Sequence, residues 1–146
     1  MSEAVSTHLG ASGASEFVQL HSGDEEWKPG FDPEFGIQVM NVHGDPSQPG
    51  IYVIRIKWPP NTMSRPHHHP EDRHCTVLSG TWHAGTGPEF DPSTSTALGP
   101  GSYMFHPGGA VHWDGSKDEE AVIEIIGYGP TGMFPVDPDC CEFARI

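Results

Sequence analysis

Basic residues are scarce in this chain of 146 residues, which contains 7 lysines and arginines against 20 aspartates and glutamates. The formal net charge of −13 leaves no basic stripe that could neutralise nucleic-acid phosphates or dock on anionic lipids. Long apolar runs are also missing, since no stretch approaches the roughly 18–20 residues that span a bilayer. The sequence therefore predicts neither a nucleic acid nor a membrane as a partner.

Cysteine is rare as well. The chain contains three, which are Cys75 and the adjacent pair Cys140 and Cys141. Three thiols fit a reducing cytoplasm better than a disulfide framework. The adjacent pair is interpreted as part of a C-terminal turn, with metal binding as the alternative. The segment Met1–Ser15 is rich in Ser, Gly and Ala and lacks the regions of a secretory signal. We expect a flexible N-terminus over residues 1–15, a single domain over residues 16–146 and a cytoplasmic location.

Amphipathic helical patterns of convincing length are absent, whereas 18 glycines and 15 prolines are present. This composition suits short strands that are joined by tight turns. Residues 75–78 and 81–84 are expected to form a hairpin through Ser79 and Gly80. The chain is predicted to be all-β, a sandwich or a barrel. The expected strands cover residues 17–20, 36–42, 51–58, 75–78, 81–84, 95–98, 102–106, 111–113 and 121–126.

What the sequence does contain is histidine, ten in all, of which four lie between His67 and His74. His67 and His69 are two residues apart, so a strand would present both imidazoles on one face. Two neutral imidazoles on one face are half of a transition-metal site, and His106 or His112 could complete it from further along the chain.

Around these histidines the sequence resembles the cupin family. The first cupin motif, G-x5-H-x-H-x3-E-x6-G, and the second, G-x5-P-x-G-x2-H-x3-N, both occur with every spacing kept. The first is represented by Asn61, His67, His69, Arg73 and Gly80, and the second by Gly101, Pro107, Gly109, His112 and Ser116. The resemblance, over residues 50–127, implies a double-stranded β-helix, or jelly-roll barrel, that holds a divalent metal at positions 67, 69 and 112.

Arg73 occupies the position where the family usually has a carboxylate ligand, and a guanidinium has no lone pair for a cation. The fourth ligand is expected to be His106, with His74 as the alternative if a β-bulge turns it inward. Such a histidine-only set suits Zn²⁺, or else Fe²⁺, Ni²⁺ or Co²⁺.

Six aromatic residues fall in predicted strands near this site. Together they favour a flat apolar cavity that suits an aromatic or polyketide-like ligand. These residues are Tyr52, Trp58, Trp82, Tyr103, Phe105 and Trp113.

Within the cupins, the chain length, the histidine-only metal site and the Gly/Pro-rich composition resemble single-domain aromatic polyketide cyclases of the resistomycin and tetracenomycin type. This resemblance implies a Zn²⁺-dependent intramolecular aldol condensation and dehydration of a poly-β-ketone, a role in antibiotic biosynthesis. His83, another cavity histidine or a hydroxide on the metal could be the base. Two alternatives remain: a non-haem iron dioxygenase that acts on a diketone or aromatic substrate, and a non-catalytic, metal-stabilised binding barrel. We expect a homodimer.

Overall fold

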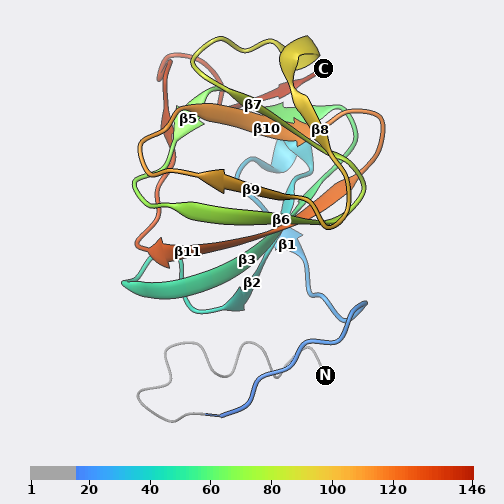
Figure 1. Cartoon of the computed structure of the whole chain (residues 1–146), viewed down its shortest axis with the longest axis vertical. Helices are drawn as coiled ribbons and strands as arrows, with labels where there is room; N and C mark the ends of the chain where they lie inside the picture. The colour runs from blue at the N-terminus through green and yellow to red at the C-terminus, as the bar shows by residue number, and fades with distance from the viewer. Residues whose placement is uncertain (1–15) are drawn as a thin grey trace.

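The computed structural model describes residues 16–146, and in this part the chain forms two antiparallel β-sheets that face each other (Figure 1). The prediction of flexibility for residues 1–15 lies outside the described residues. In order of hydrogen bonding, the first sheet contains β1 (Lys28–Pro29), β2 (Gln38–His43), β3 (Gly50–Trp58), β11 (Ala121–Gly129), β6 (Arg73–Ser79) and β9 (Tyr103–His106).

The second sheet runs in the order β12 (Phe134–Pro135), β5 (His67–His68), β10 (His112–Ser116), β4 (Thr62–Ser64) and β13 (Phe143–Arg145). In it, β7 (Trp82–Thr86) lies between β10 and β8 (Thr96–Leu98). Residues 16–146 contain only two short 3₁₀ turns, η1 (Pro33–Phe35) and η2 (Pro92–Thr94). No helix in this part of the chain is long and apolar enough to cross a bilayer. The all-β jelly-roll prediction is confirmed.

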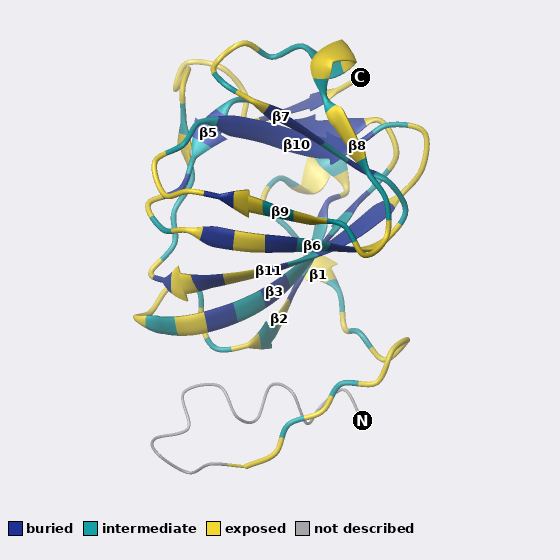
Figure 2. Cartoon of the chain, in the orientation of Figure 1, coloured by how far each residue is buried: buried dark blue, intermediate teal, exposed yellow. Residues whose placement is uncertain are grey.

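The core lies between the two sheets and is built by side chains that alternate along the strands. On β3, Tyr52, Ile54, Ile56 and Trp58 are buried, while the residues between them are more exposed. The same alternation appears as banding along β6, whereas every residue of β10 is buried (Figure 2). Burying one such apolar side chain contributes roughly 1.5–3 kcal/mol, so this pattern selects the inward face of each strand.

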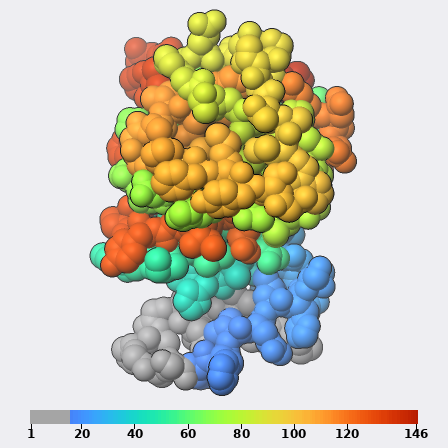
Figure 3. All heavy atoms as spheres, viewed as in Figure 1, coloured from blue at the N-terminus to red at the C-terminus, as the bar shows by residue number. Residues whose placement is uncertain are grey.

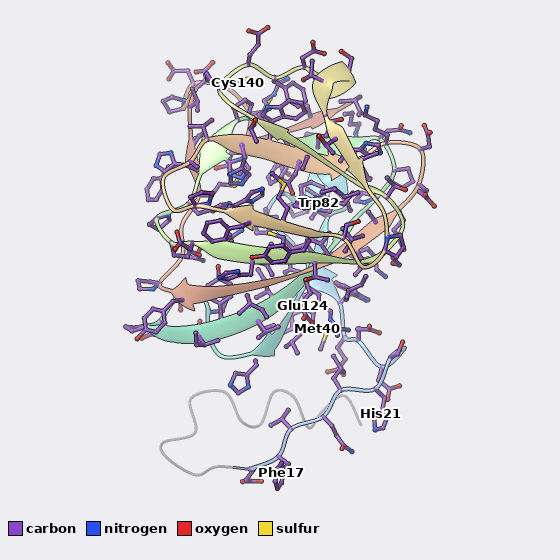
Figure 4. All side chains as sticks on the ribbon, in the orientation of Figure 1. Phe17, His21, Met40, Trp82, Glu124 and Cys140 are labelled. Carbon is purple, nitrogen blue, oxygen red and sulfur yellow. The ribbon has the colours of Figure 1, made fainter. Side chains whose placement is uncertain are left out.

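One expected strand does not form, and several short ones were missed. Residues 17–20 pair with no other strand, and Phe17 is fully exposed on a segment apart from the two sheets (Figure 4). The same segment projects below the packed atoms of the sheets in the space-filling view (Figure 3). The edge strand is instead β1, which pairs with β2. Strands β4, β5, β12 and β13 have two or three residues each, too few for an alternating pattern to be recognised.

The hairpin predicted at Ser79 and Gly80 is wrong, because the chain changes sheets there. β6 pairs with β9 and β11, whereas β7 pairs with β8 and β10. Gly80 has a φ of +70°, and a Cβ at this position would lie 2.0 Å from the backbone oxygen of Glu120. The corner therefore needs glycine for its backbone conformation and for the close approach of the chain at the start of β11.

Gly80→Ala is expected to destabilise the protein by more than about 2 kcal/mol. Placing alanine in a left-handed conformation costs roughly 1–2 kcal/mol, and the contact with Glu120 adds to this cost. Gly87→Ala is the matched control, since Gly87 has a φ of +89° and a Cβ added there would meet no atom within 4 Å. Urea unfolding should show a clearly larger loss at position 80. Equal losses would mean that backbone conformation alone determines the effect.

Candidate metal centre

His67, His69 and His112 converge inside the barrel. The pairing of β5 with β10 sets His67 directly opposite His112, and His69 follows β5 by one residue. One ring nitrogen from each lies within 4.8 Å of the others, and all three residues are buried. The sequence prediction that these imidazoles meet is confirmed, and the cluster could hold a metal ion.

The three rings are oriented by hydrogen bonds to the backbone. In each ring Nδ1 faces a carbonyl oxygen, and a carbonyl oxygen only accepts, so Nδ1 carries the proton and Nε2 keeps its lone pair. Three lone pairs on Nε2 are the donor set that a borderline divalent metal prefers. The Nδ1 to oxygen distances are 2.6 Å from His67 to Arg65, 2.7 Å from His69 to Gly132 and 3.1 Å from His112 to Ala110.

Burial keeps these imidazoles neutral. It lowers the pKa of His67 to about 4 and, with the positive charge of Arg73, lowers the pKa of His69 to about 2. The pKa of His112 is also lowered, again mainly by burial. Neutral imidazole is the form that binds metal, so the cluster does not have to lose protons first at neutral pH.

His106 lies beside the cluster but outside the set of nitrogens that meet within 4.8 Å. Its ring stacks on His112 with centroids 3.8 Å apart and an interplanar angle of 25°. Its Nδ1 is 4.0 Å from Sγ of Cys75, and its Nε2 is buried with no hydrogen-bond partner among the residues described. An unpartnered buried nitrogen is costly, which leaves His106 as the predicted fourth ligand.

The alternative fourth ligand, His74, is wrong. It lies on β6 between the buried residues Arg73 and Cys75, is itself exposed, and its Nδ1 is 2.6 Å from the hydroxyl of Tyr103. A β-bulge would be needed to turn it inward, but the pairing of β6 with β9 is regular here. The alternation of the strand therefore places His74 on the outer face of the barrel.

His83 does not reach the cavity either, so the geometry does not support its predicted role as the base. On β7 the inward residues are Trp82 and Ala84, both buried, and His83 between them is half-buried on the opposite face. Its charged neighbours there are Lys117 and Asp118.

The three histidines line a cavity of about 240 Å³. Of the six predicted aromatic residues, Trp58 and Trp82 line it, and Figure 4 shows Trp82 between the two sheets. Sequence reasoning missed several other apolar lining residues, because no motif contains them. These are Phe31, Ile56, Ile125, Met133 and Phe143.

The other four predicted aromatic residues are not among the residues that line this cavity. Tyr103 and Phe105 lie on the outer face of β9 and are 56% and 41% exposed. Tyr52 and Trp113 are fully buried elsewhere, and Trp113 packs edge-on against Phe90. The strand pattern identified these positions, but it did not determine which side of the strand faces the cavity.

A buried carboxylate, Asp114, completes the wall and was missed by sequence reasoning. One carboxylate oxygen accepts a hydrogen bond from Nε1 of Trp82, and the other accepts one from Oγ of Ser64, both at 2.9 Å. Asp114 follows His112 by two residues on β10, and both line the cavity. This period of two is the signal that could have identified it.

Arg73, which lines this cavity, forms a largely buried ion pair with Glu71. The side chains are 10% and 9% exposed, and Nε of Arg73 lies 3.4 Å from Oε2 of Glu71. The hydroxyl of Tyr52 also donates to Oε2, and burial raises the pKa of Tyr52 to about 12, which keeps this donor protonated. Glu71 is therefore a partner of Tyr52 and Arg73, with no hydrogen bond to a cluster histidine among residues 16–146.

The adjacent residues Cys140 and Cys141 are not among those that line this cavity, and Figure 4 shows Cys140 at the outer edge of the barrel. Both are exposed and unbridged, and the backbone N–H of Cys140 donates to the carbonyl oxygen of Asp137 in a turn. Their interpretation as a C-terminal turn is confirmed.

Comparisons with known proteins agree with this architecture. The fold is similar to that of the polyketide cyclase RemF from Streptomyces resistomycificus, with a TM-score of 0.70 and 17% identity, covering 84% of this chain and 87% of that one. It is also similar to the DMSP lyase DddQ from Ruegeria pomeroyi DSS-3, with a TM-score of 0.62 and 17% identity over 80% and 64% of the two chains. The structure of KdgF from Halomonas sp. is similar with a TM-score of 0.56 and 21% identity, covering 75% of this chain and 93% of that one. At these identities the likeness shows a shared fold.

A search of curated proteins finds no match. The sequence profile of the ChrR cupin-like domain, however, matches residues 15–131. This range contains both histidine motifs and most strands of the two facing sheets. The chain therefore belongs to the cupins, as a member of the ChrR cupin-like domain family.

Proposed function

We propose that the protein is a metal-dependent cyclase that closes a ring in a poly-β-ketone by intramolecular aldol condensation and dehydration. One observation carries the proposal: three buried, neutral imidazoles direct Nε2 into a cavity that is otherwise lined mainly by aromatic and aliphatic side chains. The shared fold with a polyketide cyclase supports it.

His67, His69 and His112, with His106 as the fourth ligand, would hold Zn²⁺, or alternatively Fe²⁺, Ni²⁺ or Co²⁺. When bound, such an ion acts as a Lewis acid that polarises a ketone and acidifies the adjacent methylene group. Each carboxylate oxygen of Asp114 accepts one side-chain hydrogen bond from the protein, so each keeps a lone pair that can take the methylene proton. Trp82 and Ser64 hold this carboxylate in place.

The apolar walls would hold the flexible chain in the shape that reacts. Trp58, Trp82 and Phe143 offer flat surfaces, and aligned intramolecular reactions can gain roughly 7–11 kcal/mol over free encounters. A volume of about 240 Å³ is smaller than the ~300–1,000 Å³ that encloses a drug-sized ligand. We propose that the cavity surrounds the closing ring and leaves a longer chain to extend through its mouth.

The test uses the full chain loaded with one metal at a time and a synthetic poly-β-ketone, with product analysis and an oxygen electrode. We expect a single aromatic product with Zn²⁺, no oxygen uptake, and at least a hundredfold lower rate after chelation. Oxygen uptake by the Fe²⁺ form would establish the dioxygenase alternative instead. Tight substrate binding without turnover for any metal would establish the binding barrel.

A further inference from the structure

We infer that Arg73 forms an oxyanion-binding subsite beside the histidine cluster, so that the ligand is an apolar, flat molecule with one carboxylate or enolate group. This inference rests on the proposed function for the role of the cluster, but the geometry of Arg73 supports the subsite independently.

Arg73 is directed into the cavity by its strand. On β6 it alternates with Cys75 and Val77 on the inward face, it is 8% exposed, and it lines the same cavity as the three histidines. A charged side chain buried this deeply needs partners.

The protein satisfies only part of the guanidinium. Of its five N–H groups, one on Nε contacts Glu71, and one on Nη2 donates to Oγ1 of Thr131 at 3.1 Å. Nη1 has no hydrogen-bond partner anywhere in residues 16–146. Three donors therefore remain, two on Nη1 and one on Nη2, and the edge between Nη1 and Nη2 can bind a carboxylate with two parallel hydrogen bonds.

A purely structural ion pair with Glu71 does not explain this arrangement. The contact is single and long, at 3.4 Å, and it uses Nε although a two-point pair is the stronger geometry. Oε1 of Glu71 is buried without a partner among the described residues, and Oε2 is shared with Tyr52. Glu71 and Thr131 instead hold the guanidinium at one end and leave its other edge open to the cavity.

With a divalent metal ion bound, the net charge of the cavity also favours an anionic ligand. At their formal charges, Arg73 and a divalent ion on neutral histidines are offset by Glu71 and Asp114, which leaves one positive charge. A ligand with one negative oxygen group would balance it, and the group would lie between two cations that otherwise repel each other. The apolar lining, with Trp58, Met133 and Phe143, accepts the apolar part of the ligand.

The experiment measures binding to the metal-free full chain through quenching of tryptophan fluorescence, because Trp58 and Trp82 line the cavity. The probes are benzoate, its neutral isostere benzamide, and acetylacetone at a pH where it is an enolate. We expect benzoate to bind at least tenfold more tightly than benzamide, with weaker binding as salt increases. The acetylacetone arm shows whether an enolate serves as well as a carboxylate.

Arg73→Gln should lose this preference, and Arg73→Lys should keep only part of it, since lysine keeps the charge but lacks the two-point edge. Arg65→Gln is the matched control, because Arg65 is an arginine that does not line this cavity. Equal binding of benzoate and benzamide by the wild type would overturn the inference, even if Arg73→Gln fails to fold. So would an unchanged preference in folded Arg73→Gln. Because the binding experiment uses metal-free protein, its result does not depend on the cyclase reaction. Failure of the cyclase test would not contradict the Arg73 subsite, and failure of the benzoate test would not contradict the proposed cyclase.

Discussion

His67→Ala is expected to abolish tight metal binding. The ring centroid of His67 lies 4.8 Å from that of His69 and 4.5 Å from that of His112, so its loss leaves two of the three nitrogens that meet in the cluster, with His106 outside that set. Removing a residue that only orients a ligand typically lowers metal affinity about 10–100-fold. We expect removal of a ligand itself to lower the affinity by more than about a hundredfold. The bound metal per chain, measured by elemental analysis after dialysis, should fall from about one to near zero.

His68→Ala is the matched control for this experiment, since His68 is the adjacent histidine and stacks outside the cluster on Phe134. It should retain the metal, and added metal should raise the melting temperature of the wild type and of His68→Ala but not of His67→Ala. Retention of one metal per chain by His67→Ala would place the site elsewhere and remove the basis of the proposed function.

Acidification is expected to destabilise the metal-free protein well before the carboxylates titrate. Burial lowers the pKa of His67 and His106 to about 4 and that of His69 to about 2, from an ordinary value of 6.5. The unfolded chain therefore takes up protons near pH 6.5, while the folded chain takes them up only below about pH 4. The contribution of these groups to the free energy of unfolding is fully present above pH 6.5. It is lost as the pH drops from 6.5 toward 4, by about 1.4 kcal/mol per pH unit for each group.

Urea unfolding midpoints at pH 7.5, 6.0 and 5.0 measure this dependence. His106→Gln should make the decline shallower, and His43→Gln should leave it unchanged, because His43 is exposed on β2. A midpoint that stays constant from pH 7.5 to 5.0 would show that the cluster histidines are not buried as neutral groups.

The parts of the site that could be predicted depend on spacing along one strand or within one motif. His67 and His69 share a face because they are two residues apart, and the second motif identified His112. Asn61, which replaces a motif glycine, adopts a φ of +59°, a left-handed conformation that asparagine tolerates better than most residues.

The homodimer, the identity of the metal and the cytoplasmic location stay predictions.

The sequence by itself determined the all-β class, most of the longer strand segments and the histidines that meet, because these follow from local alternation and motif spacing. Only the tertiary structure decided which face of each strand is inward, and thus excluded His74, His83, Tyr103 and Phe105 from the cavity. It also decided that Gly80 turns the chain into the other sheet and that Arg73 and Asp114 face the cluster. The physical reason is that alternation relates neighbours on one strand, whereas inward and outward are defined only once a second sheet covers one face.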